Sequence, residues 1–179
     1  FNKNTLLAHN VGAGKTYIMV SAGEELLRLG YSTKNLYVVP NSIIGQWEEF
    51  YRNMYPNANL LVVYPKDFTP AKRDRVLEDI KYNNHVAVYM AYSSFDMIVM
   101  SKAHYIDKYT KEILKIKTSL YNVKTKHEKR ALQKQEKFLA KKLAKYSEEE
   151  KECQWMTFDQ LGIETLVVDE AHNFGARTY

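Results

Sequence analysis

Five consecutive residues near the start of the chain combine two glycines, a cation and a hydroxyl: Gly12, Ala13, Gly14, Lys15 and Thr16. Glycine reaches backbone conformations with positive φ and has no Cβ to keep an anion away from the backbone. Successive N–H groups in such a turn, at the start of a helix, form a concave site for an anion. The lysine would contact the phosphates of ATP, and the threonine hydroxyl would hold Mg²⁺. These residues predict a phosphate-binding loop of the P-loop type.

The segments on either side of this loop suit such a role. Residues 5–8 form a short apolar run that predicts a buried strand, and residues 16–29 predict a helix. One face of that helix is expected to be apolar and to consist of Ile18, Met19, Ala22, Leu26 and Leu29. The full P-loop pattern has a further glycine where His9 stands, so a plain strand–turn–helix remains an alternative.

A second group with catalytic chemistry lies at the other end of the chain. Residues 165–168 are apolar and are followed directly by Asp169 and Glu170. This pattern predicts a buried parallel strand that presents two carboxylates at its C-terminal end. In a P-loop enzyme, the first acid would bind Mg²⁺ and the second would polarise the attacking water. A strand followed by a solvated acidic turn is the alternative.

Strands alternate with helices between these two groups. Apolar runs at residues 36–39, 60–64 and 86–91 predict three more strands, with amphipathic segments after each of the first two. The alternation predicts an α/β fold with a parallel sheet and helices on both faces. Ligands of such sheets bind at the carboxyl ends of the strands, where the glycine loop and the acid pair are both expected.

Composition and length narrow the class of protein. The 179 residues suit one domain with a substantial core, and 45% hydrophobic with 26% charged residues is ordinary for a soluble protein. No apolar run approaches the roughly 18 residues of a membrane span. The chain begins at Phe1 without a signal-peptide pattern and ends soon after His172, so we interpret it as a piece of a longer protein. The single Cys153 fits a reducing cytoplasm, the expected location.

The positive charge is concentrated in one segment. Residues 101–152 hold 15 Lys/Arg and 8 Asp/Glu, a balance of +7, whereas the whole chain has a net charge of +5. This segment lacks glycine, proline and strand-like runs, and it predicts two helices folded as a hairpin. We interpret residues 101–156 as a basic helical insertion. It would contact DNA phosphates, dock another domain, or present a solvated Lys/Glu surface.

With these features in place, the chain resembles the first RecA-like lobe of superfamily-two helicases and translocases, especially the Swi/Snf-type DNA translocases. Residues 7–16 are similar to that family's L-A-D-E-M-G-L-G-K-T, which also lacks the first P-loop glycine. Residues 36–50 are similar to its V-V-P-x-S-L-L-x-Q-W-x-x-E-F, and residues 88–95 to its T-Y-E-x-L segment. Residues 169–172 match the D-E-A-H box.

The resemblance covers residues 5–100 and 157–175 and implies a RecA-like three-layer fold, with the whole chain as one ATP-binding lobe. Its activity would be ATP hydrolysis coupled to motion along DNA. By position in the motifs, Lys15 and Thr16 would bind the phosphates and Mg²⁺. Asp169 would bind the metal, Glu170 would orient the water, and His172 would link the nucleotide site to the DNA site.

The resemblance also implies a DNA contact and a missing partner. Pro40, Asn41, Ser42 and Gln46 fall where the family contacts the DNA backbone, which positions a protein without reading sequence. Ser42 is also a candidate N-cap for the helix that follows, and capping alone is the alternative role for this loop. A second RecA-like lobe would supply arginine fingers worth about 10³–10⁵ in rate, so this chain alone is expected to hydrolyse ATP barely, if at all.

The motifs depart from the family at one point, where His9 and Asn10 replace an acidic pair beside the glycine loop. The leading prediction is the motor lobe of a DNA-dependent ATPase, from a modular protein such as a restriction-modification or mobile-element helicase–methylase. The alternative is a nucleotide-binding interaction module whose helical hairpin recruits a protein partner. An intact Glu170 argues against the module, because a protein that only binds ATP has no need of a water-polarising acid.

Overall fold

Four parallel strands form one sheet in the computed structural model, which describes residues 4–10, 12–123, 125–148 and 155–172. The strands are β1 (Asn35–Val39), β2 (Leu60–Val63), β3 (Ala87–Ala91) and β4 (Thr165–Val168), in the order β2-β3-β1-β4. Strand β1 pairs with β3 on one side and β4 on the other, and all three pairings are parallel. This arrangement confirms the predicted α/β fold.

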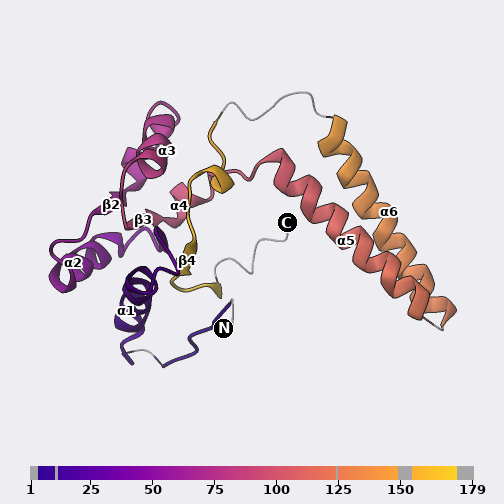
Figure 1. Ribbon diagram of the computed structural model, residues 1–179, viewed down its shortest axis with the longest axis horizontal. Helices are drawn as coiled ribbons and strands as arrows, with labels where there is room; N and C mark the ends of the chain where they lie inside the picture. Colours follow the sequence, from indigo (N-terminus) through magenta and orange to yellow (C-terminus); the bar gives the residue numbers. More distant parts are fainter. Residues whose placement is uncertain (1–3, 11, 124, 149–154, 173–179) are drawn as a thin grey trace. The chain divides into compact units, whose positions relative to one another are not determined.

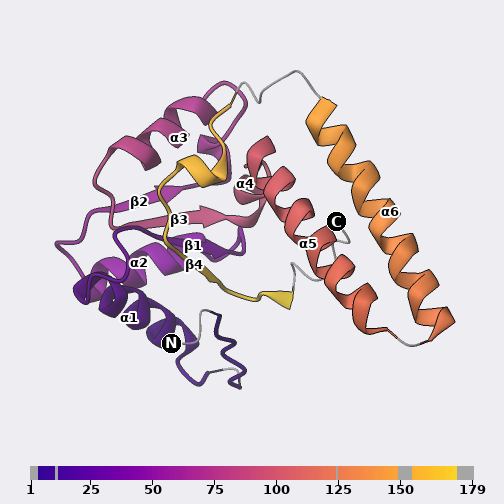
Figure 2. The ribbon, with the colours of Figure 1, turned by 45° about the vertical axis from the view of Figure 1, so that its right-hand side comes forward.

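Helices cover both faces of the sheet (Figures 1 and 2). The helices on one face are α1 (Lys15–Arg28) and α2 (Ile44–Met54), which share a hydrophobic cluster with β1 and β3. Helix α3 (Arg73–Tyr82) lies on the opposite face and buries Leu77 and Ile80. All five residues of β1 and of β3 are buried, as expected for strands covered on both sides.

The face that α1 presents to the sheet differs from the predicted one. The buried residues of α1 are Met19, Val20 and Gly23, whereas Ala22 and Leu29 are exposed. The cause is Gly23, whose carbonyl accepts a hydrogen bond of 2.9 Å from Asn35 Nδ2. The missing side chain lets the helix approach β1 closely, and the apolar face is rotated accordingly.

The predicted strand at residues 5–8 is absent, and this prediction was wrong. Leu6 is 81% exposed and no ladder bond is formed by this segment, although Leu7 packs against the hydrophobic cluster. A buried strand requires a hydrogen-bonded neighbour, and β4 pairs only with β1 among the described strands. Without that neighbour the apolar run remains irregular.

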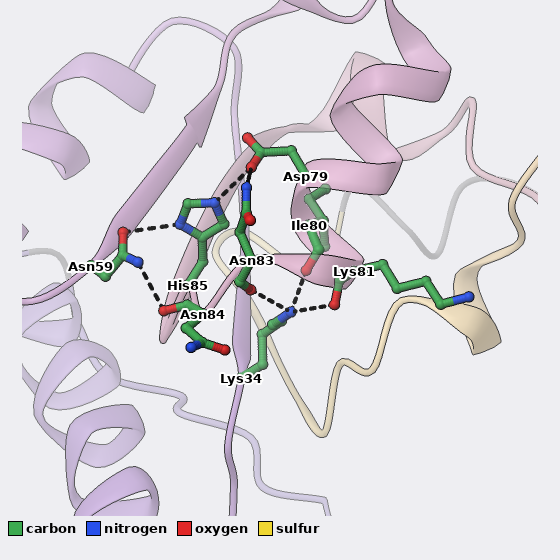
Figure 3. A network of polar contacts seen from close by, with 8 residues as sticks. All are labelled: Lys34, Asn59, Asp79, Ile80, Lys81, Asn83, Asn84 and His85. Atoms are coloured by element: carbon green, nitrogen blue, oxygen red, sulfur yellow. Dashed lines mark hydrogen bonds and ion pairs between the residues drawn. The ribbon is translucent and has the colours of Figure 1, made fainter.

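A buried lysine joins β1 to the end of α3 (Figure 3). The Lys34 ammonium donates to the carbonyls of Ile80, Lys81 and Asn83, the last two at 3.4 and 3.3 Å. These carbonyls belong to the helix C-terminus, where a cation is favourable. Burial nevertheless lowers the pKa of Lys34. The contact holds α3 against the start of the central strand.

Residues Val99–Gln160 form a second compact unit. It contains two long helices, α5 (Lys102–Asn122) and α6 (Lys126–Glu148), which lie side by side and antiparallel (Figure 1). The ends of the unit meet, because the Phe158 N–H donates to the Val99 carbonyl at 2.8 Å and the Ser101 N–H to Asp159 Oδ1 at 2.9 Å. The predicted insertion, 101–156, spans this hairpin, and its residues 124 and 149–154, including Cys153, lie outside the described residues.

Among the described helices, none is both long enough and apolar enough to cross a bilayer.

Gly23→Ala tests the close approach of α1 to the sheet. A Cβ at position 23 would lie 1.9 Å from the hydroxyl oxygen of Tyr37, a fully buried side chain. Alanine normally stabilises a helix interior by about 0.5–1 kcal/mol relative to glycine, whereas overpacking costs about 1–3 kcal/mol. We expect a net loss of about 1–2 kcal/mol of unfolding free energy in urea titrations. Gly45→Ala is the matched control, since its Cβ would come no closer than 3.7 Å to another atom and stability should not fall.

Candidate active site

The glycine loop ends at the N-terminus of α1 with a geometry that only glycine adopts easily. Gly12 has φ of 82° and Gly14, the N-cap, has φ of 75°. A Cβ on either residue would meet nothing within 4 Å, so backbone conformation rather than crowding requires glycine. The first helical bond runs from the Ile18 N–H to the Gly14 carbonyl, at 3.1 Å. The three preceding amides of the helix therefore have no acceptor within it and suit an anion.

The Lys15 side chain folds back over the loop. Its ammonium donates to the carbonyls of His9 and Asn10, each at 3.2 Å. The Ala13 N–H donates to the same Asn10 carbonyl at 3.3 Å, which closes the turn. The cation is thus held by neutral carbonyls, and an anionic phosphate would be a stronger acceptor.

Asp169 directly follows β4, and its surroundings destabilise the charged form of its carboxylate. Burial raises its pKa, and repulsion from Glu170 acts in the same direction. A backbone hydrogen bond from Glu170, a hydrogen bond from Trp47 and the charge of Lys15 oppose the shift without cancelling it. The charge of Lys15 acts on Asp169, so the glycine loop and the acid pair, far apart in sequence, lie within electrostatic range of each other. A bound divalent cation would stabilise the charged form of this acid.

Glu170 has an unusual backbone conformation. Its φ is 52°, and it is the only non-glycine with positive φ among the described residues. A conformation of this kind costs free energy and is found mainly where function requires it. Its carboxylate Oε2 lies 3.2 Å from Nδ1 of His172, which is mostly exposed. The acid predicted to orient water and the histidine predicted to couple the two sites are therefore in direct contact.

Tyr92 and Ser93 connect the loops at the carboxyl edge of the sheet, and sequence reasoning did not select either as a site residue. The Tyr92 hydroxyl donates to the backbone carbonyl of Asp169 and lies 3.2 Å from that of Glu170. Burial, with the nearby carboxylates, raises the pKa of Tyr92 to about 12, so it remains a donor. Asn41 and Ser93 exchange two hydrogen bonds, of 2.9 and 3.2 Å. The position of Tyr92 and Ser93 directly after β3 was the available signal.

The predicted DNA-contacting residues lie on the same edge, in the loop after β1 and the first turn of α2. Ser42 does not cap α2, contrary to the capping alternative, because the helix has Ile43 at its N-cap and no side-chain cap. The Ser42 and Gln46 side chains are exposed and have no hydrogen-bond partner among the described residues. The Asn41 side chain is hydrogen-bonded to Ser93, and Pro40 is half-buried. The loop thus offers Ser42 and Gln46 to a ligand and uses Asn41 for its own support.

The comparison with protein families decides the general class. All 179 residues, 1–179, match the model of a family described as "Probable helicase domain". This chain is a member of the probable helicase domain family. No curated protein and no solved structure matches it. Membership of the helicase domain family supports a helicase-like function and, at a general level, an enzyme of the ATPase/helicase type.

Asp169→Asn tests the electrostatic state of the helicase domain. Because the native pKa is raised above 3.8, the wild-type domain loses stability as pH rises through the interval between the unfolded and native values. The variant carries no charge there, so at pH 7 without Mg²⁺ it should be more stable, by at most about 1 kcal/mol because solvent screens a half-exposed carboxylate. The difference should vanish well below pH 3.8, where both side chains are neutral.

Thermal melts from pH 3 to 8 would measure this effect. The sign of the difference in melting temperature between the variant and the wild type is the decisive result. Asp74→Asn is the control, because Asp74 lies in the first turn of α3 and interacts favourably with the helix N-terminus. Its loss should lower stability slightly at pH 7. A lower stability of Asp169→Asn at pH 7 would contradict the assignment of a desolvated, repelled carboxylate.

Proposed function

We propose that this helicase domain is the ATP-binding motor lobe of a DNA-dependent ATPase of the translocase type, resembling Swi/Snf-type enzymes. The observation that carries the proposal is the glycine loop at the N-terminus of α1, with φ of 82° at Gly12 and 75° at Gly14. The Lys15 ammonium folds back over this loop, and its charge acts on Asp169, which precedes the αL backbone of Glu170. Family membership supports the helicase-like class. Full activity would require a second RecA-like lobe.

The residues present fit a magnesium nucleotide. The backbone of Gly12, Ala13 and Gly14 would surround the phosphates, and Lys15 would exchange its two loop carbonyls for phosphate oxygens. Thr16 and Asp169 would hold Mg²⁺, which usually retains several waters and is bound by one or two carboxylates plus phosphate oxygens. When bound, the ion neutralises charge on the transferred phosphoryl group.

Glu170 would orient the attacking water. Its αL backbone turns the chain sharply after Asp169. The two neighbouring acids could then act on different ligands, Asp169 on Mg²⁺ and Glu170 on the attacking water. Tyr92 fixes this turn through the carbonyls of both acids. His172 holds the Glu170 carboxylate at 3.2 Å, which makes it the route by which events outside the nucleotide site would reach the water-orienting acid.

DNA would contact the loop after β1, through the exposed Ser42 and Gln46 and the backbone near Pro40 and Asn41. This loop and the acid turn are connected through the residues that follow β3, since Ser93 binds Asn41 and Tyr92 binds the carbonyl of Asp169. A shift of the loop on DNA would thereby be transmitted to the turn that carries Glu170. This is the physical basis that we propose for stimulation of hydrolysis by DNA.

Lys15→Ala and Glu170→Gln separate nucleotide binding from hydrolysis. With the 179-residue chain and a fluorescent ATP analogue plus Mg²⁺, Lys15→Ala should weaken binding at least about tenfold, since a charge-assisted contact is lost. Glu170→Gln should bind normally, as should Lys66→Ala, an exposed lysine far from the loop in sequence.

In the full-length protein, both active-site variants should lose duplex-stimulated ATP turnover, whereas Lys66→Ala should retain it. Nucleotide binding with no DNA-dependent turnover in the wild-type full-length protein would overturn the motor assignment. That result would favour a nucleotide-binding module whose helical hairpin recruits a protein.

The double substitution Ser42→Ala with Gln46→Ala tests the DNA-contacting loop. Neither side chain supports the fold through a hydrogen bond to a described residue, so stability and nucleotide affinity should be unchanged. We expect the DNA concentration for half-maximal ATPase stimulation of the full-length protein to rise about fivefold, the effect of losing roughly 1 kcal/mol of net hydrogen bonding. Ser119→Ala, an exposed serine on α5, is the control. An unchanged DNA dependence would exclude this loop from the contact.

A further inference from the structure

Helices α5 and α6 pack against each other along one row of apolar side chains, called the seam below. This contact determines the direction in which the remaining side chains of α6 point. Buried and half-buried residues along the seam recur at spacings of four and three, as in a coiled coil. They are Tyr109, Ile113, Ile116 and Leu120 on α5, with Leu132, Leu139, Leu143 and Tyr146 on α6. Glu136 occupies the corresponding position between Leu132 and Leu139 and pairs with Lys117 of α5 at 3.9 Å.

Opposite this seam, α6 carries a row of cations, which we call the α6 stripe. Its members are all exposed and lie three or four residues apart: Arg130, Lys134, Lys137, Lys141 and Lys145. At 1.5 Å per residue the stripe extends roughly 22 Å. No acidic residue interrupts this row between its first and last members, because Glu136 faces the seam.

Three other lysines of the hairpin have partners of a kind that the stripe lacks among the described residues. Lys111 pairs with Asp107 at 2.6 Å, Lys117 pairs with Glu136, and Lys142 lies over the rings of Tyr109 and Phe138. Within the described part of the chain, no ion pair or ring contact involves a member of the stripe.

Like charges three and four residues apart destabilise a helix, so the stripe works against the folding of α6. The seam stabilises the hairpin without any contribution from these side chains. A solvated helix surface would normally interleave glutamates with lysines, and α6 does so only outside the stripe. This arrangement is explained by an anionic ligand that covers the stripe.

We propose that the α6 stripe binds the phosphate backbone of duplex DNA, as a contact additional to the loop after β1. A rigid line of positive charge matches a rigid line of phosphates, which in B-DNA lie about 3.4 Å apart along each strand. The members of the stripe are all cations, and Phe138, exposed at its edge, lies under the ammonium of Lys142 at 4.7 Å. A single aromatic ring beside a row of cations is a poor platform for successive unpaired bases and a small anchor for a lipid surface, so the stripe suits a duplex better than either. Membership of a helicase family places nucleic acid among the ligands of the chain.

The test compares two triple substitutions of equal charge in the 179-residue chain without nucleotide. The stripe variant is Lys134→Gln, Lys137→Gln and Lys141→Gln, and the control is Lys66→Gln, Lys72→Gln and Arg75→Gln in the other unit. Glutamine has nearly the helix propensity of lysine, and like-charge repulsion is removed, so α6 should fold at least as well. Circular dichroism at 222 nm would verify this.

The readout is the anisotropy of a fluorescein-labelled 20-bp duplex of mixed sequence, measured between 50 and 200 mM NaCl. Each phosphate contact contributes about 0.9 to the slope of log K against log salt, so the stripe variant should lose about 2.7 from that slope. Its affinity near 100 mM salt should fall at least about tenfold, while the control changes little. Lys15→Ala should bind the duplex normally, which separates this contact from the proposed nucleotide site.

Three results would overturn the proposal. The first is an equal loss in the stripe variant and the control, which would show only a general effect of charge. The second is a folded stripe variant with unchanged affinity and slope. The third is tighter binding of the wild-type stripe to phosphatidylserine vesicles or to polyglutamate than to the duplex, which would assign the stripe to a membrane or an acidic protein.

Discussion

The parallel pairing of β1 with strands on both sides determines where the candidate functional residues after β1, β3 and β4 lie. Val39 is in register with Ala91 of β3, and Val38 with Val168 of β4, so the three strands end at the same edge. The loops that leave this edge begin with Pro40, Tyr92 and Asp169, and side chains and carbonyls from all three are connected by hydrogen bonds. A slip of one residue in either pairing would separate these loops and reverse the faces of the strand.

The same edge of the sheet contains unfavourable electrostatic interactions that no other part of the described fold fully compensates. The neighbouring acids after β4 repel each other, the first of them is partly desolvated, and the second has an αL backbone. Among the described residues, the ammonium of Lys15 is bound only by the carbonyls of His9 and Asn10. The magnesium nucleotide proposed above would relieve the repulsion between the two acids and give the lysine an anionic partner.

Much of this was predictable because the determining signals are local. Glycines before a Lys-Thr pair, and two acids after an apolar run, fix the conformation and chemistry of their own short segments, and alternating strands and helices indicated a parallel sheet. The errors involve long-range contacts. The strand at residues 5–8 needed a neighbour that its own sequence cannot reveal, and the face of α1 depended on what Gly23 approaches. Tyr92 was overlooked because its partner lies 77 positions away. The N-cap alternative for Ser42 was wrong, because a good capping residue does not guarantee that the helix begins beside it.

The hydrogen bonds that join the two ends of the hairpin unit make its length independent of the chain that flanks it. Because Phe158 meets Val99 and Asp159 meets Ser101, the long excursion between them leaves and returns at one point. A segment closed in this way can be lengthened, shortened or exchanged without altering the span that the flanking chain must bridge. The stability of the sheet and the length of the hairpin are therefore separable properties of this chain.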